Sequence, residues 1–413
     1  MHRMAYVDRI VDPLIDRIVA GLPAALIVGP RAVGKTTTAR RRGASMLRLD
    51  RPEDANLVRL DADAAVAGRS EPLVIDEWQL APDVLAAVKR AVDDDSRPGR
   101  FLMTGSAGAD LDAAGWPATG RVVRVPMFGF TVRERQRHGT APPFIDALVE
   151  GRGEIARASA AETVRDYVAL ALRSGFPEAS ALDDDVLRRL WLSSWVDQLV
   201  ARDVQLGASG RDPVRVRRLL QAIAANTARV VSDATLYRAA AVTRVTGVAY
   251  DMLLETLFVT ERLPAWSSNR LTRLAKAPKR HLIEPALVGP LLGVDVDGVL
   301  RDSDLLGGLL ESFVVAQLRS ELAVSAGNPQ MFHLRQADGR HEVDLLIERA
   351  DGALVAIEVK ATTTPTSGDA RHLHWLRDAL GDRVRAAVLL HAGRHAVPLG
   401  DGVVGLPIAA IWS

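Results

Sequence analysis

The segment that most constrains the fold of this chain is Gly29–Thr36, which reads GPRAVGKT and matches the phosphate-binding loop pattern GxxxxGK[ST]. It follows the apolar run AALIV at residues 24–28 and opens into a helical stretch. In this strand–loop–helix setting, glycines let backbone N–H groups point at a β-phosphate. Residue frequencies predict about 0.003 chance matches in the chain, so an ordinary glycine turn is the weaker interpretation.

The loop pattern predicts individual contacts with a nucleotide. Lys35 is expected to bridge the β- and γ-phosphates as a catalytic residue, and the Thr36 hydroxyl is expected to bind Mg²⁺. The predicted cofactors are therefore ATP and Mg²⁺. The predicted nucleotide-binding residues are Gly29, Pro30, Arg31, Ala32, Val33, Gly34, Lys35, Thr36, Thr37 and Thr104.

An acidic pair ends a later apolar run. The sequence PLVIDE at residues 72–77 finishes in Asp76 and Glu77. We expect Asp76 to hold Mg²⁺ through water and Glu77 to polarise the attacking water as a catalytic residue. Such a pair is weak evidence alone, since strand ends often meet solvent, but the phosphate loop upstream strengthens the assignment.

Polar residues also end the strand FLMTGSA. Thr104 and Ser106 can sense a γ-phosphate or orient water, and the alternative is a capped turn. Arg121 begins the next strand and is a candidate arginine finger. In a chain with 47 Arg and 5 Lys, an ordinary surface arginine is at least as good an interpretation of Arg121.

The pattern of apolar residues divides the chain. Short apolar runs from residue 24 to about 128 predict a parallel sheet with crossover helices, and residues 130–225 carry helical periodicity. Helices at Val216–Ala225, Ser232–Ala241 and Thr246–Leu257, followed by the strand FVTERLPAW, suggest a winged helix-turn-helix. After about residue 280 the pattern mixes helices and strands.

A second set of charged residues lies towards the C-terminus. HEVDLLIE contains Asp344, and AIEVK contains Glu358 and Lys360, which alternation places on one strand face. Glu311, in the helix GGLLESFVVAQL, is a further carboxylate. The set predicts a nuclease site in which Asp344 and Glu358 bind Mg²⁺ or Mn²⁺ and Lys360 positions water. The alternative is an exposed ion pair of Glu358 with Lys360.

Composition restricts the class of protein. Hydrophobic residues are 48% and charged residues 25% of the chain, which is typical of globular proteins and excludes a disordered chain. No apolar run approaches the roughly 20 residues of a membrane-spanning helix. The absence of cysteine excludes disulfides and thiolate chemistry, and a reducing cytoplasm is the expected location. With 52 basic and 51 acidic residues, the net charge is +1, which argues against electrostatic binding of nucleic acid over the whole surface. Any contact with nucleic acid is therefore expected to be local.

One segment is locally basic. Residues 262–280 hold Trp266, no acidic residue and the six basic residues Arg262, Arg270, Arg273, Lys276, Lys279 and Arg280. A basic strand-loop of this kind predicts a contact with the backbone of DNA or RNA. The alternatives are a solvated loop or a contact with the acidic region that follows it. The preceding helix contains Asp251 and Glu255, which disfavours sequence-specific readout.

Taken together, the motifs resemble one family. They are GPRAVGKT, VIDEWQ, MTGSA, GFPE, LLESFV, EVD and IEVK. The family comprises bacterial and archaeal ATP-binding proteins that join an AAA-type P-loop domain to a C-terminal domain of unknown function similar to PD-(D/E)xK nucleases. The resemblance covers nearly the whole chain. IEPALV at residues 283–288 departs from it, because many members have an aspartate followed by threonine and glycine there.

The resemblance implies an α/β fold in four parts. These are an AAA-like parallel-sheet domain (1–135), a helical lid (136–214), a winged-helix segment (215–280) and a restriction-endonuclease-like α/β domain (281–413). By the same resemblance, Gly29, Gly34, Lys35 and Thr36 are nucleotide contacts, Asp76 and Glu77 are the Walker B pair, and Glu311, Asp344, Glu358 and Lys360 form the nuclease-like set.

Two functions remain open from the sequence. In the first, ATP hydrolysis controls a nuclease-like domain that acts on nucleic acid. In the second, the protein is a nucleotide-dependent regulator whose C-terminal domain is a catalytically silent interaction module. The four nuclease-like residues favour the first function, and the net acidic C-terminal region favours the second. A membrane partner is not expected, and a homo-oligomer is a candidate assembly.

Overall fold

The apolar runs of the N-terminal part form the parallel sheet that the sequence predicts. The computed structural model describes residues 5–106, 119–139, 141–151, 158–203, 212–269, 272–273, 276–336 and 340–413. The strands of this sheet are β1 (Ala24–Gly29), β2 (Ser45–Arg48), β3 (Leu73–Asp76), β4 (Phe101–Ser106) and β5 (Val123–Pro126). They lie in the order β2-β3-β4-β1-β5, and every pair is parallel. Their carboxyl ends therefore share one edge, which is where ligands bind in open α/β sheets.

Helices cover both faces of this sheet, which explains why β1 and β3 are buried throughout. They are α1 (Asp12–Gly21), α2 (Lys35–Arg40), α3 (Pro52–Leu60), α4 (Ala62–Val66), the 3₁₀ turn η1 (Trp78–Leu80) and α5 (Val84–Asp94). One face packs against α1 and α2 through Ile15 and Ala39, and the other packs against α5 through Val84 and Val88.

A helical region follows the sheet. Its elements are α6 (Val132–Arg135), α7 (Phe144–Val149), α8 (Val164–Arg173), α9 (Pro177–Ser180), α10 (Asp185–Gln198), the π-helical turn η3 (Leu199–Asp203), α12 (Pro213–Ala225), α13 (Asp233–Ala239) and α14 (Arg244–Thr256). The last three lie where the sequence predicts helices. They are followed by β6 (Thr260–Leu263) and β7 (Lys279–Leu282), which pair antiparallel. The assignment of this segment to a winged helix stays a prediction.

The C-terminal part contains a mixed sheet. Its strands are β8 (Gln330–Arg335), β9 (Glu342–Glu348), β10 (Leu354–Lys360), β11 (Val384–His391), β12 (Val397–Gly400) and β13 (Val403–Pro407), in the order β12-β13-β11-β10-β9-β8. The other elements are η4 (Pro285–Leu287), α16 (Val288–Leu292), α17 (Val296–Arg301), α18 (Ser303–Leu322), α19 (Arg371–Leu380), η5 (Gly381–Arg383) and η6 (Ile408–Ile411). Helices α18 and α19 pack on opposite faces of the sheet.

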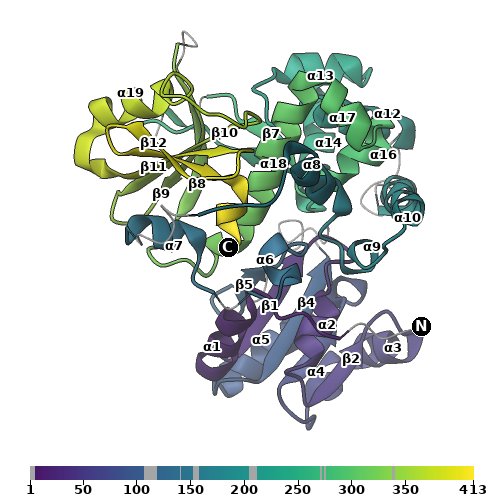
Figure 1. The fold of residues 1–413 in the computed structure, drawn as a ribbon. Helices are drawn as coiled ribbons and strands as arrows, with labels where there is room; N and C mark the ends of the chain where they lie inside the picture. Colours follow the sequence, from purple (N-terminus) through teal and green to yellow (C-terminus); the bar gives the residue numbers. More distant parts are fainter. Residues whose placement is uncertain are drawn as a thin grey trace.

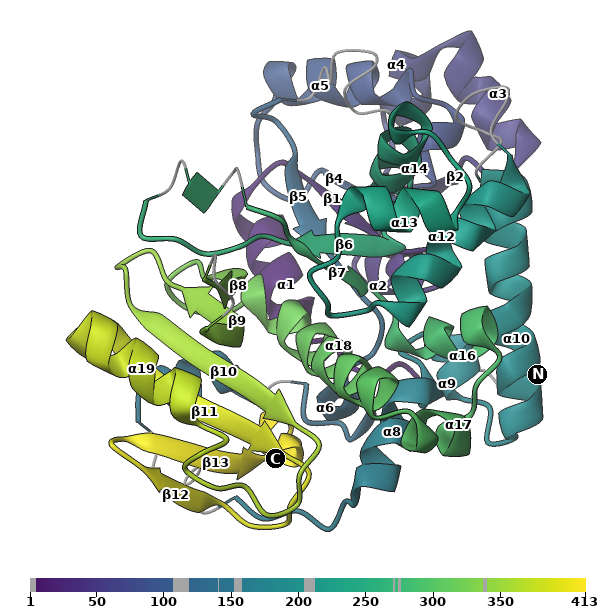
Figure 2. The same ribbon diagram turned by 90° about the horizontal axis from the view of Figure 1, so that it is seen from above.

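The long helix α18 connects the parts of the molecule. Figure 1 shows the N-terminal sheet below, with the helical region and the C-terminal sheet side by side above it. In Figure 2, α18 lies between the C-terminal sheet and the helices around α16 and α17. Its Gln317 side chain accepts a hydrogen bond of 2.7 Å from the Val132 N–H, and Glu321 accepts one of 2.7 Å from the Phe144 N–H.

The short helices α16 and α17 pack against α8, α10 and α12. These contacts place them with the helical region, although the boundary expected from the sequence assigns residues after 280 to the C-terminal domain. None of the helices in the described ranges has the length and apolar character needed to cross a membrane.

Candidate functional site

The phosphate loop begins at the end of β1, beside the end of its parallel neighbour β5. Gly29 has a φ of +153°, and a Cβ there would lie 1.9 Å from the Met127 carbonyl oxygen. Gly34 has a φ of +93° immediately before α2. Because both positions have dihedral angles that L side chains rarely adopt, this loop path requires glycine at each. The path places Lys35 and Thr36 at the start of α2, beside the carboxyl edge of the sheet.

Lys35 is buried inside the loop. Its Nζ donates hydrogen bonds to the carbonyl oxygens of Gly29 (2.9 Å) and Pro30 (2.6 Å). Burial lowers the pKa of Lys35 to about 8, against the charges of Glu77 and Asp76, which act to raise it. The ammonium group is therefore enclosed by the backbone that the sequence predicts will hold phosphates.

Four of the predicted residues meet where the ends of β3 and β4 face the start of α2. Asp76 Oδ1 accepts hydrogen bonds from Thr36 Oγ1 (2.7 Å) and Thr104 Oγ1 (2.5 Å). The Glu77 N–H lies 3.4 Å from Thr104 Oγ1. The structure thus brings together Thr36, Asp76, Glu77 and Thr104, and it shows that the Thr104 hydroxyl contacts Asp76. Ser106 ends β4, and its side chain lies outside the described part of the structure.

Glu77 lies in a sharp turn after β3. Its φ of +56° is in the left-handed region, and the Gln79 amide donates a hydrogen bond to Glu77 Oε2. Gly105 lies under this turn, where a Cβ would be 2.5 Å from Trp78 Nε1. The turn positions the Glu77 carboxylate, and Gln79 is a partner that sequence reasoning missed. Its spacing of two residues from Glu77 was the available signal.

Arg9 is a second contributor that sequence reasoning missed. Its guanidinium is buried and donates to the carbonyl oxygens of Val33 (2.9 Å) and Phe128 (2.6 Å). It also pairs with Glu134 at 3.0 Å, and Glu134 caps α6 together with Thr131. Arg9 therefore holds the phosphate loop against the segment that leads into the helical region. No local pattern around Arg9 distinguishes it from the other arginines.

Helix α10 borders the outer bend of the phosphate loop. A cavity of about 350 Å³ lies between Arg31 and Ala32 of the loop and Trp191 and Trp195 of α10. The two indole rings are held by Phe176, with ring centroids 5.5 and 5.0 Å away. The assignment of residues 136–214 as a helical lid stays a prediction.

Arg121 does not reach this site, which corrects its interpretation as an arginine finger within the same chain. It pairs with Asp93 at 2.8 Å, on an exposed surface near the end of α5. The physical reason is the strand direction. Arg121 precedes the amino end of β5, whereas the phosphate loop follows the carboxyl end of the parallel neighbour β1.

The C-terminal charged residues form a cluster around an unexpected cation. Lys279 Nζ lies 2.8 Å from Glu311 Oε1, 3.2 Å from Asp344 Oδ1 and 3.3 Å from Glu342 Oε1, and the Lys279 side chain is 1% exposed. Burial acts to lower the pKa of Lys279, but the charges of Glu311, Asp344 and Glu342 raise it well above its ordinary value. The cation in this cluster is therefore Lys279, and not the predicted Lys360.

Glu358 and Lys360 lie on β10, beside Asp344 on the neighbouring strand β9. Glu358 is buried, neither of its carboxylate oxygens has a hydrogen-bond partner in the described structure, and Lys360 Nζ is 3.6 Å from Oε2. Burial raises the pKa of Glu358 to about 8. Burial also acts to raise the pKa of Asp344, but Lys279, Lys360 and the Val359 N–H bring it below its ordinary value.

This arrangement differs from the predicted metal site. Within the described ranges, no three His, Asp or Glu side chains are grouped so that they could hold a metal ion. The reason is the ammonium of Lys279, which occupies the space between the carboxylates of Glu311 and Asp344. Lys360 is 40% exposed, and its ammonium lies 3.6 Å from Glu358 Oε2.

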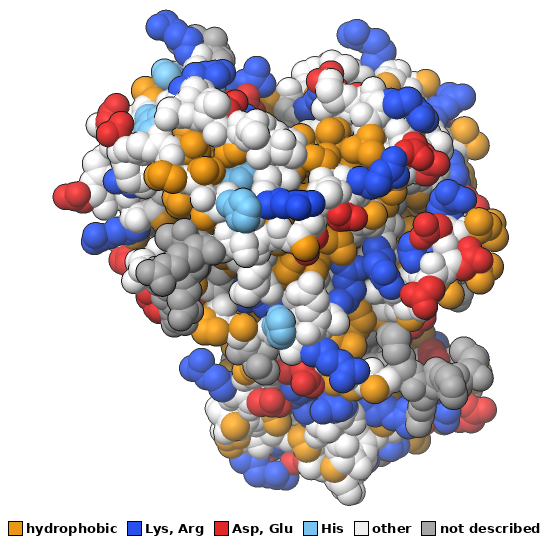
Figure 3. Space-filling view, viewed as in Figure 1, with side chains coloured by type: hydrophobic (Ala, Val, Ile, Leu, Met, Phe, Trp, Pro, Cys, Tyr) orange, Lys and Arg blue, Asp and Glu red, His pale blue; other side chains and the backbone are white. Residues whose placement is uncertain are grey.

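The basic segment 262–280 makes internal ion pairs, and those of Arg273 and Lys279 are the expected alternative of a contact with the acidic region that follows it. Arg262 pairs with Asp251 and Glu255, Arg273 with Glu348, Lys279 with Glu311, and Arg280 with Asp251 and Asp233. Arg270 lies outside the described residues. Of the described basic residues in this segment, Lys276 alone has no ion pair. Most of the side chains predicted to contact nucleic acid therefore form ion pairs within the protein. On the face in Figure 3, basic and acidic side chains are interspersed.

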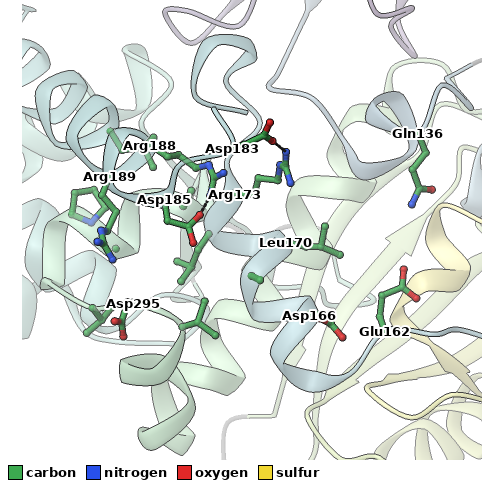
Figure 4. A pocket seen from close by; sticks show the side chains of 18 residues that line it. Gln136, Glu162, Asp166, Leu170, Arg173, Asp183, Asp185, Arg188, Arg189 and Asp295 are labelled. Carbon is green, nitrogen blue, oxygen red and sulfur yellow. Dashed lines mark hydrogen bonds and ion pairs between the residues drawn. The ribbon is translucent and has the colours of Figure 1, made fainter. Parts of the chain in front are cut away.

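A larger cavity lies away from both clusters. It has a volume of about 470 Å³ and is lined by α8, α10 and the α16–α17 segment (Figure 4). Arg173 pairs with Asp183 and Arg188 pairs with Asp185 at its rim. Leu170 and Leu192 also line the cavity, together with the charged side chains of Glu162, Arg189 and Asp295.

Comparison with known proteins gives the relatives of this chain. It is 30% identical over 393 residues to the uncharacterized protein Rv2008c of Mycobacterium tuberculosis, and the match covers 93% of this chain and 80% of the relative. The chain belongs to the family of that protein. The uncharacterized protein Mb2031c of Mycobacterium bovis matches with the same identity and coverage.

Three domain families match successive parts of this chain. Residues 22–136 match an AAA domain, residues 164–297 match a domain of unknown function (DUF8612), and residues 306–411 match a domain of unknown function (DUF4143). Among solved structures, the Walker-type ATPase PABY2304 of Pyrococcus abyssi is similar with 15% identity and a TM-score of 0.43, over 70% of this chain and 97% of that one. By the family match, residues 22–136 are similar to AAA domains.

Proposed function

We propose that this protein binds ATP with Mg²⁺ at the Gly29–Thr36 loop and hydrolyses it. The observation that supports this most is the meeting of Thr36 with Asp76, 2.7 Å apart, beside the buried Lys35. An AAA domain match over residues 22–136 supports the same function. Because hydroxyl and carboxylate oxygens are the ligands that Mg²⁺ prefers, the residues present fit the ion.

Each side chain then has a proposed role. Lys35 would contact phosphate oxygens in place of its loop carbonyl contacts, and Thr36 and Asp76 would hold Mg²⁺. Thr104 orients Asp76 by its hydrogen bond of 2.5 Å. Glu77 orients the attacking water, with Gln79 holding its carboxylate. Bound Mg²⁺ supplies charge that offsets the charge developing on the phosphates.

The binding part of this proposal is tested by nucleotide affinity. Replacing Lys35 with Ala removes the ammonium that contacts the phosphates, so the Kd for ATP with Mg²⁺ should rise at least tenfold. A matched control is Lys89→Ala, because Lys89 lies on the exposed side of α5 and pairs with Asp93. Equal affinities of the wild type and Lys35→Ala, measured by calorimetry, would show that the loop does not hold the nucleotide phosphates.

The nuclease activity stays a prediction, and the described contacts favour the alternative, a nucleotide-dependent interaction module. Lys279 occupies the acidic cluster and most of the described basic segment is paired internally. The test is incubation of DNA and RNA with Mn²⁺, with and without ATP. Cleavage that is lost in Asp344→Ala would favour the nuclease. The cytoplasmic location and a homo-oligomer also stay predictions, the second testable by light scattering.

A further inference from the structure

A cavity of about 570 Å³ lies beside the phosphate loop, on the side of the edge strand β2. Thr36 and Arg40 of α2 line it, together with Arg48 at the end of β2 and Arg51 immediately before α3. Sites for small molecules typically have volumes of about 300–1,000 Å³. The cavity is therefore large enough for a small organic molecule next to the proposed ATP site.

The charged side chains among the described lining of this cavity are all positive. They are Arg40, Arg48 and Arg51, with no acidic residue among them. Arg40 and Arg51 are exposed, and neither forms an ion pair within the described ranges. Arg48 pairs with Asp50 at 2.8 Å on the surface. The cavity thus has two guanidinium charges that no ion pair offsets.

An exposed arginine without a partner is ordinary when it stands alone. Here three guanidinium groups share one cavity, and like charges that share a cavity repel one another. In the basic segment 262–280, carboxylates such as Asp251 and Glu348 relieve the same kind of repulsion. No side chain of the described lining does so here, so we expect a bound anion to take that place.

The number and geometry of these groups favour a phosphate monoester. A guanidinium presents a planar fork of N–H donors that matches two phosphate oxygens. Arg48 has a donor left over, because its Nε has no hydrogen-bond partner in the described structure. A phosphate monoester carries a charge of about −1.5 to −2 at pH 7, which balances Arg40 and Arg51, whereas a carboxylate carries one charge. Inorganic phosphate alone would leave most of the volume empty, so we expect the phosphate to carry an organic body.

We propose that this cavity binds a small organic phosphate, whose phosphate group is held by Arg40, Arg48 and Arg51. Because Thr36 lines the cavity and also belongs to the phosphate loop, this second phosphate site is adjacent to the first. The inference goes beyond the proposed ATPase function and does not depend on it, since the three arginines are not among the residues proposed to hold ATP.

The experiment measures binding of ribose 5-phosphate to the full-length protein by calorimetry, without nucleotide. We expect one molecule to bind per chain, and the double variant Arg40→Met with Arg51→Met should raise its Kd at least tenfold. The matched control Arg17→Met should leave the Kd unchanged, because Arg17 is an exposed arginine of α1 outside the described lining of the cavity. Ribose, which lacks the phosphate, should not bind. Saturating ATP with Mg²⁺ should not displace ribose 5-phosphate.

A wild type that does not bind ribose 5-phosphate, or a folded double variant that binds it equally well, would overturn the proposal. So would displacement by ATP, because the probe and ATP would then share one site. Glutarate bound as tightly as ribose 5-phosphate would indicate a dicarboxylate site instead, and a DNA strand bound more tightly through the same arginines would indicate a nucleic-acid site.

Circular dichroism checks that the double variant folds. If it does not fold, Arg48→Met takes its place, with the same expected tenfold rise in Kd, and an unchanged Kd contradicts the proposal. A chain that failed to bind ATP would leave the outcomes measured without nucleotide unchanged, so the two proposals fail separately.

Discussion

Gly29 shows how strongly a single residue limits the phosphate loop. A side chain there would meet the Met127 carbonyl oxygen at 1.9 Å, and this oxygen belongs to backbone that follows β5. Backbone atoms cannot rotate away as a flexible side chain can. The close approach also keeps the loop beside the end of the sheet, where Lys35 is enclosed.

We predict that Gly29→Ala lowers the free energy of unfolding more than replacement of a glycine whose added Cβ causes backbone strain but no clash. The control is Gly68→Ala, since Gly68 has a φ of +67° and a Cβ added there would have no atom within 4 Å. Gly68→Ala should cost about 1 kcal/mol from its backbone conformation. Gly29→Ala should cost roughly 2 kcal/mol or more, because it adds a clash. Urea unfolding measures both, and equal losses would contradict the close approach.

Helix α18 is the element on which the parts of the molecule converge. Its side chains are buried on most sides, and its C-terminal half carries Gln317, Arg319 and Glu321. Arg319 pairs with Glu261 of β6, and Glu321 pairs with Arg133 of α6 at 3.0 Å. An apolar helix with these few internal charges is held by its neighbours and not by solvent.

The charge on Glu321 predicts a pH dependence of stability. Burial raises the pKa of Glu321 to about 7, outweighing Arg133 and the Phe144 N–H, while Asp146 adds to the rise. A carboxyl group that holds its proton more tightly when folded stabilises the protein at low pH. This contribution is lost as the pH rises from about 4.5 to 7, by roughly 1 kcal/mol per pH unit.

The test of this pH dependence is urea unfolding of the wild type and Glu321→Gln between pH 5 and 7. Because glutamine cannot ionise, the free energy of unfolding of the variant should fall less steeply with pH than that of the wild type. Equal slopes for the two proteins would show that Glu321 does not titrate in this range.

Elements with strong local signals were predictable from the sequence. Helix α18 contains the expected helical segment GGLLESFVVAQL, and strands β9 and β10 lie within two residues of the expected segments HEVDLLIE and AIEVK, because each is marked by a local apolar pattern. Strands β12 and β13 were not predicted. They are short, and VPLG and VVGLP contain proline and glycine, which disfavour strands and hide this signal.

At the scale of the whole molecule, contacts between distant segments could not be predicted from the sequence. The phosphate loop and the acidic pair at Asp76 could be located because local patterns define them. Arg9 and Lys279 could not, since each acts on residues more than 20 positions away. For the same reason, the sequence left open whether the basic segment contacts nucleic acid, solvent or the acidic region that follows it. Its charges are visible in the sequence, but partners such as Glu348 are identified only by the fold.

These distant contacts form a continuous connection between the two charged sites. Arg9 joins Val33 to Phe128, and the Arg319 guanidinium lies 5.2 Å from the centroid of the Phe128 ring. Arg319 also pairs with Glu261 of β6, the strand that pairs with the one carrying Lys279.

The central claim is that the N-terminal domain hydrolyses ATP with Glu77 as the residue that orients water. The most direct measurement is steady-state ATP hydrolysis in Mg²⁺ by the wild type and Glu77→Gln, together with the ATP affinity of each. A control is Glu53→Gln, because Glu53 is exposed in the first turn of α3.

Glutamine keeps the shape of Glu77 but removes its carboxylate. We predict that Glu77→Gln binds ATP with nearly unchanged affinity, while turnover falls by roughly 10²-fold or more. Glu53→Gln should hydrolyse ATP as the wild type does. Hydrolysis by Glu77→Gln at the wild-type rate, or a wild type that binds ATP and does not hydrolyse it, would contradict the claim.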